Sequence, residues 1–321
     1  MILALAGGVG GAKLAKGLSE VLAPEELLIA VNTGDDFEHL GLHISPDLDT
    51  MMYTLAGIND PVQGWGIAGE TWTFMQALET LGGETWFRLG DRDLATHIER
   101  TARLRAGHSL SAVTQHLCTQ LNIAHRIAPM SDDSLRTIVH TSSGRLAFQD
   151  YFVRRRAEPA VTRIDFDGVG QARMSAALHA ALGSTMLAAV IICPSNPYLS
   201  IAPILTVPGV RDALGQRRVP VIAVSPIVAG RALKGPAAKI MRELGAEPSS
   251  LAVAEFYRGL IDALVVDEAD AELSAAIDAL GMHAIVTRTV MHDLQSRTSL
   301  ARTVVDSVQS LFPLATRRSA R

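Results

Sequence analysis

The chain has 321 residues, of which 48% are hydrophobic and only 5% aromatic, and its formal net charge is −4. This length predicts one large domain or one domain with an insertion, and a mildly acidic chain without a basic stripe argues against a nucleic acid partner. No stretch reaches about 18 uninterrupted apolar residues, so no membrane-spanning segment is expected. The isolated cysteines, Cys118 and Cys193, are expected to be buried thiols of a cytoplasmic protein.

The first element is a short apolar strand, Ile2 to Ala6, that leads through glycines into a helix from about Ala12 to Leu22. Glycines let the backbone approach a ligand closely, and the amides at the start of a helix suit a phosphate. The spacing matches neither G-x-G-x-x-G nor the Walker pattern. A tight turn without a ligand would need fewer glycines. We therefore predict a phosphate-binding loop formed by Gly8, Gly10, Gly11 and Lys13.

A second apolar strand, Leu27 to Val31, ends in a polar loop that contains Asp35 and Asp36. Open parallel sheets place ligand-binding groups at the carboxyl ends of their strands. Adjacent acids at such a position, beside a phosphate loop, indicate a magnesium or ribose contact, although a solvated turn has the same composition.

The next helix is predicted to begin at Ser45 and Pro46, because serine caps helices and proline fits the first turn. Asp47 and Asp49 then lie in that first turn. A negative charge at a helix start explains Asp47. It explains Asp49 less well, since a second acid in the same turn points to the same place. Such acids beside a phosphate loop can hold a metal ion or orient a hydroxyl group.

Apolar residues at helical spacing predict further helices at 70–81, 94–105 and 110–121. They form a helical insertion at about 50–122 of a single α/β domain at 1–315, with a disordered tail at 316–321. Between two of these helices, Trp86, Phe87 and Arg88 suit a flat ring, through stacking and cation–π contact. We expect the insertion to cover a second substrate.

Later apolar segments continue a mostly parallel, Rossmann-like sheet flanked by helices. The strand at 187–193 ends at Pro194 and Pro197, which hold an extended loop, so that Ser195 and Asn196 face the strand end. Lys234, before a helix start, is a phosphate candidate or simply an exposed lysine. The remaining expected elements are an antiparallel pair at 137–141 and 145–149, strands at 124–128, 161–166, 220–224, 263–267 and 284–287, and a closing helix at 294–311.

Seven short motifs, in this order along almost the whole chain, resemble those of the 2-phospho-L-lactate transferase family. This breadth makes the resemblance specific, whereas the glycine loop alone would not. The motifs are Gly7–Lys13, Asn32–Asp36, Ser45–Thr50, Leu89–Asp93, Ser131–Asp133, Pro194–Pro197 and Val224–Ile227.

The resemblance implies transfer of a phosphorylated three-carbon acid from a guanosine diphosphate-linked donor to the ribityl hydroxyl of a deazaflavin, with release of GMP. It also implies a magnesium requirement, a homodimer, and deazaflavin contacts at Asp49 and Arg88. The combined hypothesis assigns each residue a role. The glycine loop, Ser195 and Asn196 hold the guanosine phosphates, Asp36 and Asp47 belong to the acids that hold Mg²⁺, Asp49 orients and can deprotonate the hydroxyl, and Arg88 and Trp86 grip the deazaflavin.

Two other functions stay open at this point. A sugar-nucleotide-binding regulator of the gluconeogenesis-factor-like branch keeps the glycine-rich start, but it has no need for a hydroxyl-orienting acid. A dinucleotide-dependent oxidoreductase would need the G-x-G-x-x-G pattern that is missing here. The sequence does not choose among phospholactate, phosphoenolpyruvate and 3-phosphoglycerate, because one or two side chains decide between acids that differ so little.

Overall fold

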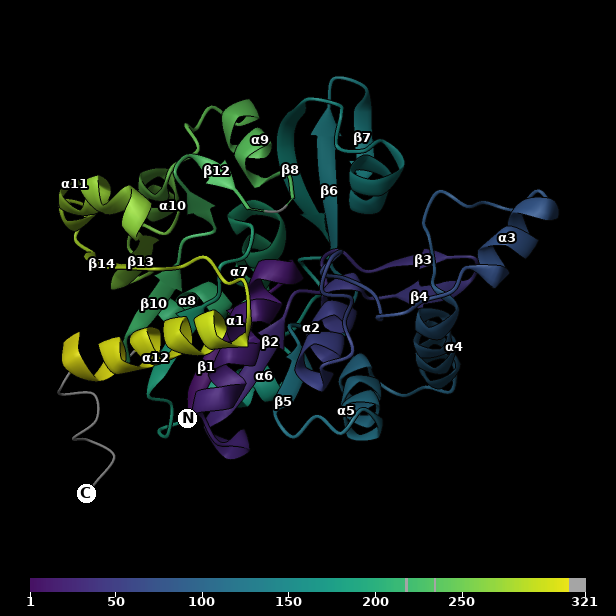
Figure 1. The fold of residues 1–321 in the computed structure, drawn as a ribbon, viewed down its shortest axis with the longest axis horizontal. Helices are drawn as coiled ribbons and strands as arrows, with labels where there is room; N and C mark the ends of the chain where they lie inside the picture. Colours follow the sequence, from purple (N-terminus) through teal and green to yellow (C-terminus); the bar gives the residue numbers. More distant parts are fainter. Residues whose placement is uncertain (217–218, 234, 312–321) are drawn as a thin grey trace.

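The core of the molecule is a seven-stranded sheet, seen in a computed structural model that describes residues 1–216, 219–233 and 235–311. The strand order is β14–β13–β10–β9–β1–β2–β5, and each neighbouring pair is parallel. The predicted Rossmann-like α/β fold is confirmed (Figure 1). The strands are β1 Ile2–Ala6, β2 Leu27–Val31, β5 Arg126–Pro129, β9 Ala189–Ile192, β10 Val221–Val224, β13 Ala263–Asp267 and β14 His283–Thr287.

Both faces of this sheet are covered, which is why its central strands are continuous apolar runs. Ile2, Ala4 and Ala6 of β1 pack with the helices of one face, and Leu3 and Leu5 pack with those of the other. The first face carries α1 Gly8–Val21, α2 Pro46–Ala56, α5 Leu110–Gln120 and α12 Leu294–Leu311, and the second carries α6 Ala176–Leu182, α7 Ala202–Thr206, α8 Val210–Gly215 and α10 Ser250–Phe256.

The strand order creates a crevice at one place along the sheet. The chain runs from β1 outward to β2 and β5, and then returns to β9 on the other side of β1. Connections that leave two neighbouring strands in opposite directions leave room for a ligand at their carboxyl ends. The glycine loop after β1 and the Pro194–Asn196 loop after β9 meet at this point.

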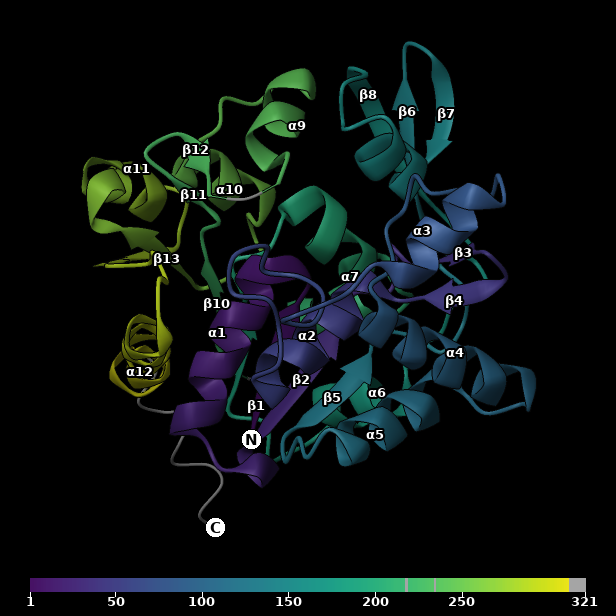
Figure 2. The ribbon, with the colours of Figure 1, turned by 45° about the vertical axis from the view of Figure 1, so that its right-hand side comes forward.

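Several elements extend beyond the sheet and its helices. Figures 1 and 2 show the β3–β4 hairpin with α3 and α4 on one side of the molecule, and the antiparallel β7–β6–β8 sheet beyond the carboxyl edge of the main sheet. Their bounds are β3 Phe37–His39, β4 Leu42–Ile44, α3 Thr73–Thr80, α4 Asp91–Arg105, β6 Arg136–Thr141, β7 Gly144–Ala147 and β8 Val161–Asp167.

Short elements complete the described chain. They are η1 Pro24–Glu26, η2 Asp150–Arg154, η3 Pro197–Ile201, β11 Ile227–Val228, β12 Arg231–Ala232, α9 Ala237–Glu243, η4 Glu268–Leu273 and α11 Ser274–Asp278. Lys234 and the predicted tail at 316–321 lie outside the described residues. Within the described ranges, no helix has both the length and the apolar character needed to cross a membrane.

The packing of α1 against α12 depends on Gly17. A methyl group at this position would clash with the carbonyl oxygen of Arg297 in α12. We expect Gly17→Ala to lower the free energy of unfolding by about 1–3 kcal/mol, measured by urea denaturation, because the two helices must move apart. Gly170→Ala is the control, since nothing lies within 4 Å of its added methyl group. Equal stability of the two variants would contradict this account.

Candidate active site

A cavity of about 630 Å³ opens at the carboxyl edge of the parallel sheet. Its volume lies in the usual range for small-molecule sites. The wall comes from the loops after β1, β2, β9, β10 and β14, from the start of α2 and from the helical insertion. Of the predicted site residues, it includes Gly8, Gly10, Lys13, Asp47, Asp49, Trp86, Arg88, Ser195 and Asn196. Segments far apart in the sequence therefore converge on one cavity.

The glycines allow the first turn of α1 to pack against two other segments. A Cβ at Gly7 would lie 2.5 Å from Asp47 Oδ2, one at Gly11 would lie 2.6 Å from Ser195 Oγ, and one at Gly10 would clash with the carbonyl of Pro194. Gly8 has a φ of +63°, which favours glycine. Because this packing continues the helix back to Gly8, the predicted start near Ala12 was wrong by one turn. Gly11 lies beneath Ser195 and does not line the cavity.

The start of α1 presents positive potential to the cavity. The helix has no acidic residue of its own in the first turn, and its amides carry partial positive charge. One of them, the Gly8 amide, donates to the Asp47 carboxylate. The Gly7 amide donates to Ser195 Oγ over 3.1 Å. Lys13 Nζ donates to the carbonyl of Met291 over 2.9 Å, also on the cavity wall. Asn196 Oδ1 caps η3 by accepting from the amides of Tyr198 and Leu199. This part of the wall suits an anionic group.

Two buried acids, Asp35 and Asp47, face the same cavity. Asp47 Oδ2 accepts a 2.9 Å hydrogen bond from Asn32 Nδ2, and Asp35 Oδ1 lies 3.4 Å from the Thr137 hydroxyl. Burial raises the pKa of Asp47 to about 6. Burial and the nearby charge of Asp47 raise the pKa of Asp35 well above its usual value. A cation would relieve both effects, because it favours the ionised carboxylates.

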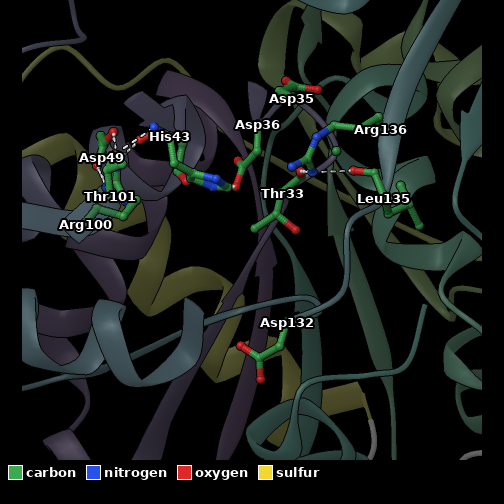
Figure 3. A network of polar contacts seen from close by, with 12 residues as sticks. Thr33, Asp35, Asp36, His43, Asp49, Arg100, Thr101, Asp132, Leu135 and Arg136 are labelled. Atoms are coloured by element: carbon green, nitrogen blue, oxygen red, sulfur yellow. Dashed lines mark hydrogen bonds and ion pairs between the residues drawn. The ribbon is translucent and has the colours of Figure 1, made fainter. Parts of the chain in front are cut away.

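Asp36 does not line this cavity, and its side chain lies beside that of His43 (Figure 3). Its Oδ2 accepts from the Ser45 hydroxyl over 2.8 Å and lies 3.1 Å from His43 Nε2. The structure therefore brings Asp35, and not Asp36, to the cavity wall beside Asp47.

Asp49, in the first turn of α2, forms a buried ion pair with Arg100 of α4. Arg100 Nη1 donates to Asp49 Oδ2 over 3.1 Å, and Nη2 donates to Oδ1. Arg100 is only 1% exposed, and its Nη1 also lies 3.4 Å from the carbonyl oxygen of His43 (Figure 3). Burial raises the pKa of Asp49, whereas the charges of Arg100 and His97 lower it. Sequence reasoning missed Arg100, because its helix carries many charged residues and reads as solvated.

Tyr53, Asp93 and His97 line the cavity wall together with Asp49. Sequence reasoning gave none of these three residues a role. The Tyr53 hydroxyl donates to Asp93 Oδ1 over 2.6 Å, and His97 Nε2 lies 3.3 Å from Asp93 Oδ2. Burial favours the neutral form of Asp93, but the nearby charge of His97 and the hydrogen bond from Tyr53 hold its pKa below the usual value. The one available signal was the spacing of Asp93 and His97, four residues apart on one helix face.

Aromatic side chains form another part of the wall. Trp86, Phe87 and Arg88 line the cavity, and the rings of Trp86 and Phe87 lie 5.8 Å apart. Two rings outside the wall pack against them: Phe37 lies 6.0 Å from Trp86, and the Trp72 ring centroid lies 3.9 Å from the Arg88 guanidinium carbon. Flat rings and a stacked guanidinium are suited to a planar ligand.

The family model described as 2-phospho-L-lactate transferase CofD matches residues 2–308. This chain belongs to the 2-phospho-L-lactate transferase family. Membership confirms the resemblance seen in the motifs and supports a transferase. It gives no support to a dinucleotide-dependent oxidoreductase.

Two relatives of this transferase family member span nearly its full length. The 2-phospho-L-lactate transferase of Methanosarcina mazei is 39% identical over 306 residues, covering 95% of this chain and 100% of that protein. The phosphoenolpyruvate transferase of Streptomyces griseus is 39% identical over 316 residues, covering 97% and 99%. A solved structure of a UPF0052 family protein from Bacillus halodurans has a TM-score of 0.60 at 14% identity, covers 95% of this chain and 98% of that chain, and supports the fold alone.

The raised pKa of Asp47 makes stability depend on pH in a defined direction. The carboxyl titrates near pH 6 when folded and near 3.8 when unfolded, so the folded protein holds this proton more tightly. The stabilisation that this bound proton gives to the folded state is present below about pH 4 and is lost as the pH rises through 6. We expect the stability of the wild type relative to Asp47→Asn to fall by about 2 kcal/mol between pH 4 and 7, by urea denaturation without divalent cations. A difference independent of pH would contradict this.

Proposed function

We propose that this protein transfers a phosphorylated three-carbon acid from a guanosine diphosphate-linked donor to the ribityl hydroxyl of 7,8-didemethyl-8-hydroxy-5-deazariboflavin, releasing GMP, in deazaflavin coenzyme biosynthesis. The observation that carries the proposal is one cavity whose wall combines the start of α1, buried carboxylates and a cluster of aromatic rings. Family membership supports the transferase class. The relatives' names favour 2-phospho-L-lactate or phosphoenolpyruvate, and both relatives described above are 39% identical to this chain.

The proposed reaction forms one bond and breaks another. The acceptor hydroxyl oxygen attacks the phosphorus that carries the three-carbon acid, the bond from that phosphorus to the bridging diphosphate oxygen breaks, and GMP leaves while the hydroxyl proton is lost to a base. Such transfer depends mainly on positioning and charge neutralisation. The first turn of α1, Lys13, Ser195 and Asn196 provide the donor phosphates with amides, a positive charge and polar side chains.

Asp49 and the aromatic wall are assigned to the acceptor. A carboxylate oxygen accepts a hydrogen bond from a hydroxyl group, and this contact fixes the direction of the lone pairs on the hydroxyl oxygen. The two hydrogen bonds from Arg100 hold the Asp49 carboxylate in one orientation. Trp86 and Arg88 are suited to hold the flat deazaflavin ring beside it.

We propose that Asp35 and Asp47 hold a magnesium ion. Carboxylate oxygens suit this hard cation, and the raised pKa values of the two acids are the sign of charge that lacks compensation. When bound, magnesium supplies positive charge that neutralises phosphate oxygens. Asp47 is retained from the sequence hypothesis, and Asp35 replaces Asp36 because it lies on the cavity wall.

A magnesium titration tests this ion site. At pH 7 we expect added magnesium chloride to raise the unfolding temperature of the wild type, because binding only to the folded state stabilises it. Asp35→Asn and Asp47→Asn should abolish most of the increase. Asp165→Asn is the control, since Asp165 lies outside the cavity wall and pairs with His140 and Arg163. An equal increase in unfolding temperature in all three variants would exclude Asp35 and Asp47 as magnesium ligands.

Product analysis tests the proposed reaction. The protein is incubated with the deazaflavin and each of three guanosine diphosphate-linked donors, which carry 2-phospholactate, phosphoenolpyruvate or 3-phosphoglycerate. We expect mass spectrometry to find one preferred adduct together with equimolar GMP. Saturable nucleotide binding without any product would favour the regulatory alternative.

Asp49→Asn serves as the matched variant in this assay. Turnover should fall by about a hundredfold or more if Asp49 contributes general base catalysis. The substitution also leaves the buried Arg100 without its carboxylate, which is destabilising. The comparison is therefore made at a temperature where circular dichroism shows the variant to be folded, and near-normal turnover there would exclude Asp49 from the mechanism.

A further inference from the structure

His97 and Asp93 form an incomplete polar pair on the cavity wall beside Asp49. His97 is buried, with a side chain that is 2% exposed, while the side chain of Asp93 is 14% exposed. His97 Nε2 lies 3.3 Å from Asp93 Oδ2, but among the described residues it has no hydrogen-bond partner of good geometry. A buried donor or acceptor without a partner is costly, which points to a missing group.

The surroundings of His97 determine which nitrogen carries the proton. Arg100 Nη1 lies 3.3 Å from His97 Nδ1, and a guanidinium can only donate. Nε2 carries the hydrogen in the tautomer that lets Nδ1 accept from Arg100, and it also carries one when the ring is protonated. The wall thus presents an N–H donor on His97 next to a carboxylate acceptor on Asp93.

A donor and an acceptor side by side match a single alcohol group, which can accept from one and donate to the other. We propose that His97 Nε2 and Asp93 Oδ2 bind one hydroxyl of the acceptor's ribityl chain, next to the hydroxyl that Asp49 orients. This inference rests on the proposed function and adds a polyol-binding subsite to it.

The neighbours of the pair support a hydroxyl over a metal ion. Asp49, Asp93 and His97 could offer three ligand atoms within 4.8 Å of one another. Arg100, however, already places a positive charge on both oxygens of Asp49. The Tyr53 hydroxyl occupies Asp93 Oδ1 and leaves Oδ2 directed toward His97. These contacts fix the orientation of Asp93, with Tyr53 as a positioning residue.

Binding of two ligands tests the subsite. The first ligand is 7,8-didemethyl-8-hydroxy-5-deazariboflavin, and the second is the same ring with a methyl group in place of the ribityl chain. Affinities are measured by quenching of ligand fluorescence. We expect His97→Asn and Asp93→Asn to weaken binding of the ribityl compound by about fivefold to tenfold and to leave binding of the ring-only compound unchanged, because only the former offers ribityl hydroxyls.

Two further variants serve as controls. His97→Gln places an amide N–H near the position of Nε2, so it should retain most of the affinity, whereas asparagine reaches only the position of Nδ1. Ile98→Ala, on the exposed side of the same helix, should have no effect on either ligand. Equal weakening of both ligands, or unchanged ribityl binding in both His97→Asn and Asp93→Asn, would overturn the subsite. Failure of the wild type to bind either ligand would instead overturn the proposed function.

Discussion

The close approach of α1 to its neighbours is the constraint on which the rest of the site depends. The first turn of this helix reaches both the loop after β9 and the carboxylate of Asp47, and it does so because Gly7, Gly10 and Gly11 have no side chain in the way. The same approach places the helix amides at the crevice between β1 and β9, where the strand order reverses. A side chain at any of the three positions would separate the anion-binding turn from the rest of the cavity.

The carboxylates of the cavity fall into two electrostatic classes. Asp35 and Asp47 are buried close together, and their pKa values are raised, which is the expected environment for a cation site. Burial also raises the pKa of Asp49, but this acid is paired with Arg100, whereas Asp93 accepts from Tyr53 and has a pKa below its usual value. Acids with such partners are suited to bind neutral hydroxyl groups. One cavity can thus offer a cation site to a charged donor and hydrogen-bonding carboxylates to a polyhydroxylated acceptor.

The regular elements were predictable because their signals are local. The strand at 263–267 and the helix at 294–311 have the predicted bounds, since apolar periodicity and turn residues mark them. The start of α1 was not predictable, because glycine disfavours helix and tertiary packing overrides that preference. The burial of Arg100 depends on Asp49, 51 residues away, and local patterns do not encode such a pair. The choice between Asp35 and Asp36 depends on the turn geometry after β2. The homodimer and the cytoplasmic location stay predictions.

The ion pair between Asp49 and Arg100 joins a helix packed on the sheet to a helix of the 50–122 segment. The 50–122 segment is therefore not an exchangeable module, because replacing it would leave Asp49 buried without its counter-charge. Divergence toward a new acceptor would have to keep this pair and vary the surrounding rings. Chimeric proteins made to change acceptor preference should place their junctions so that both charges come from the same parent.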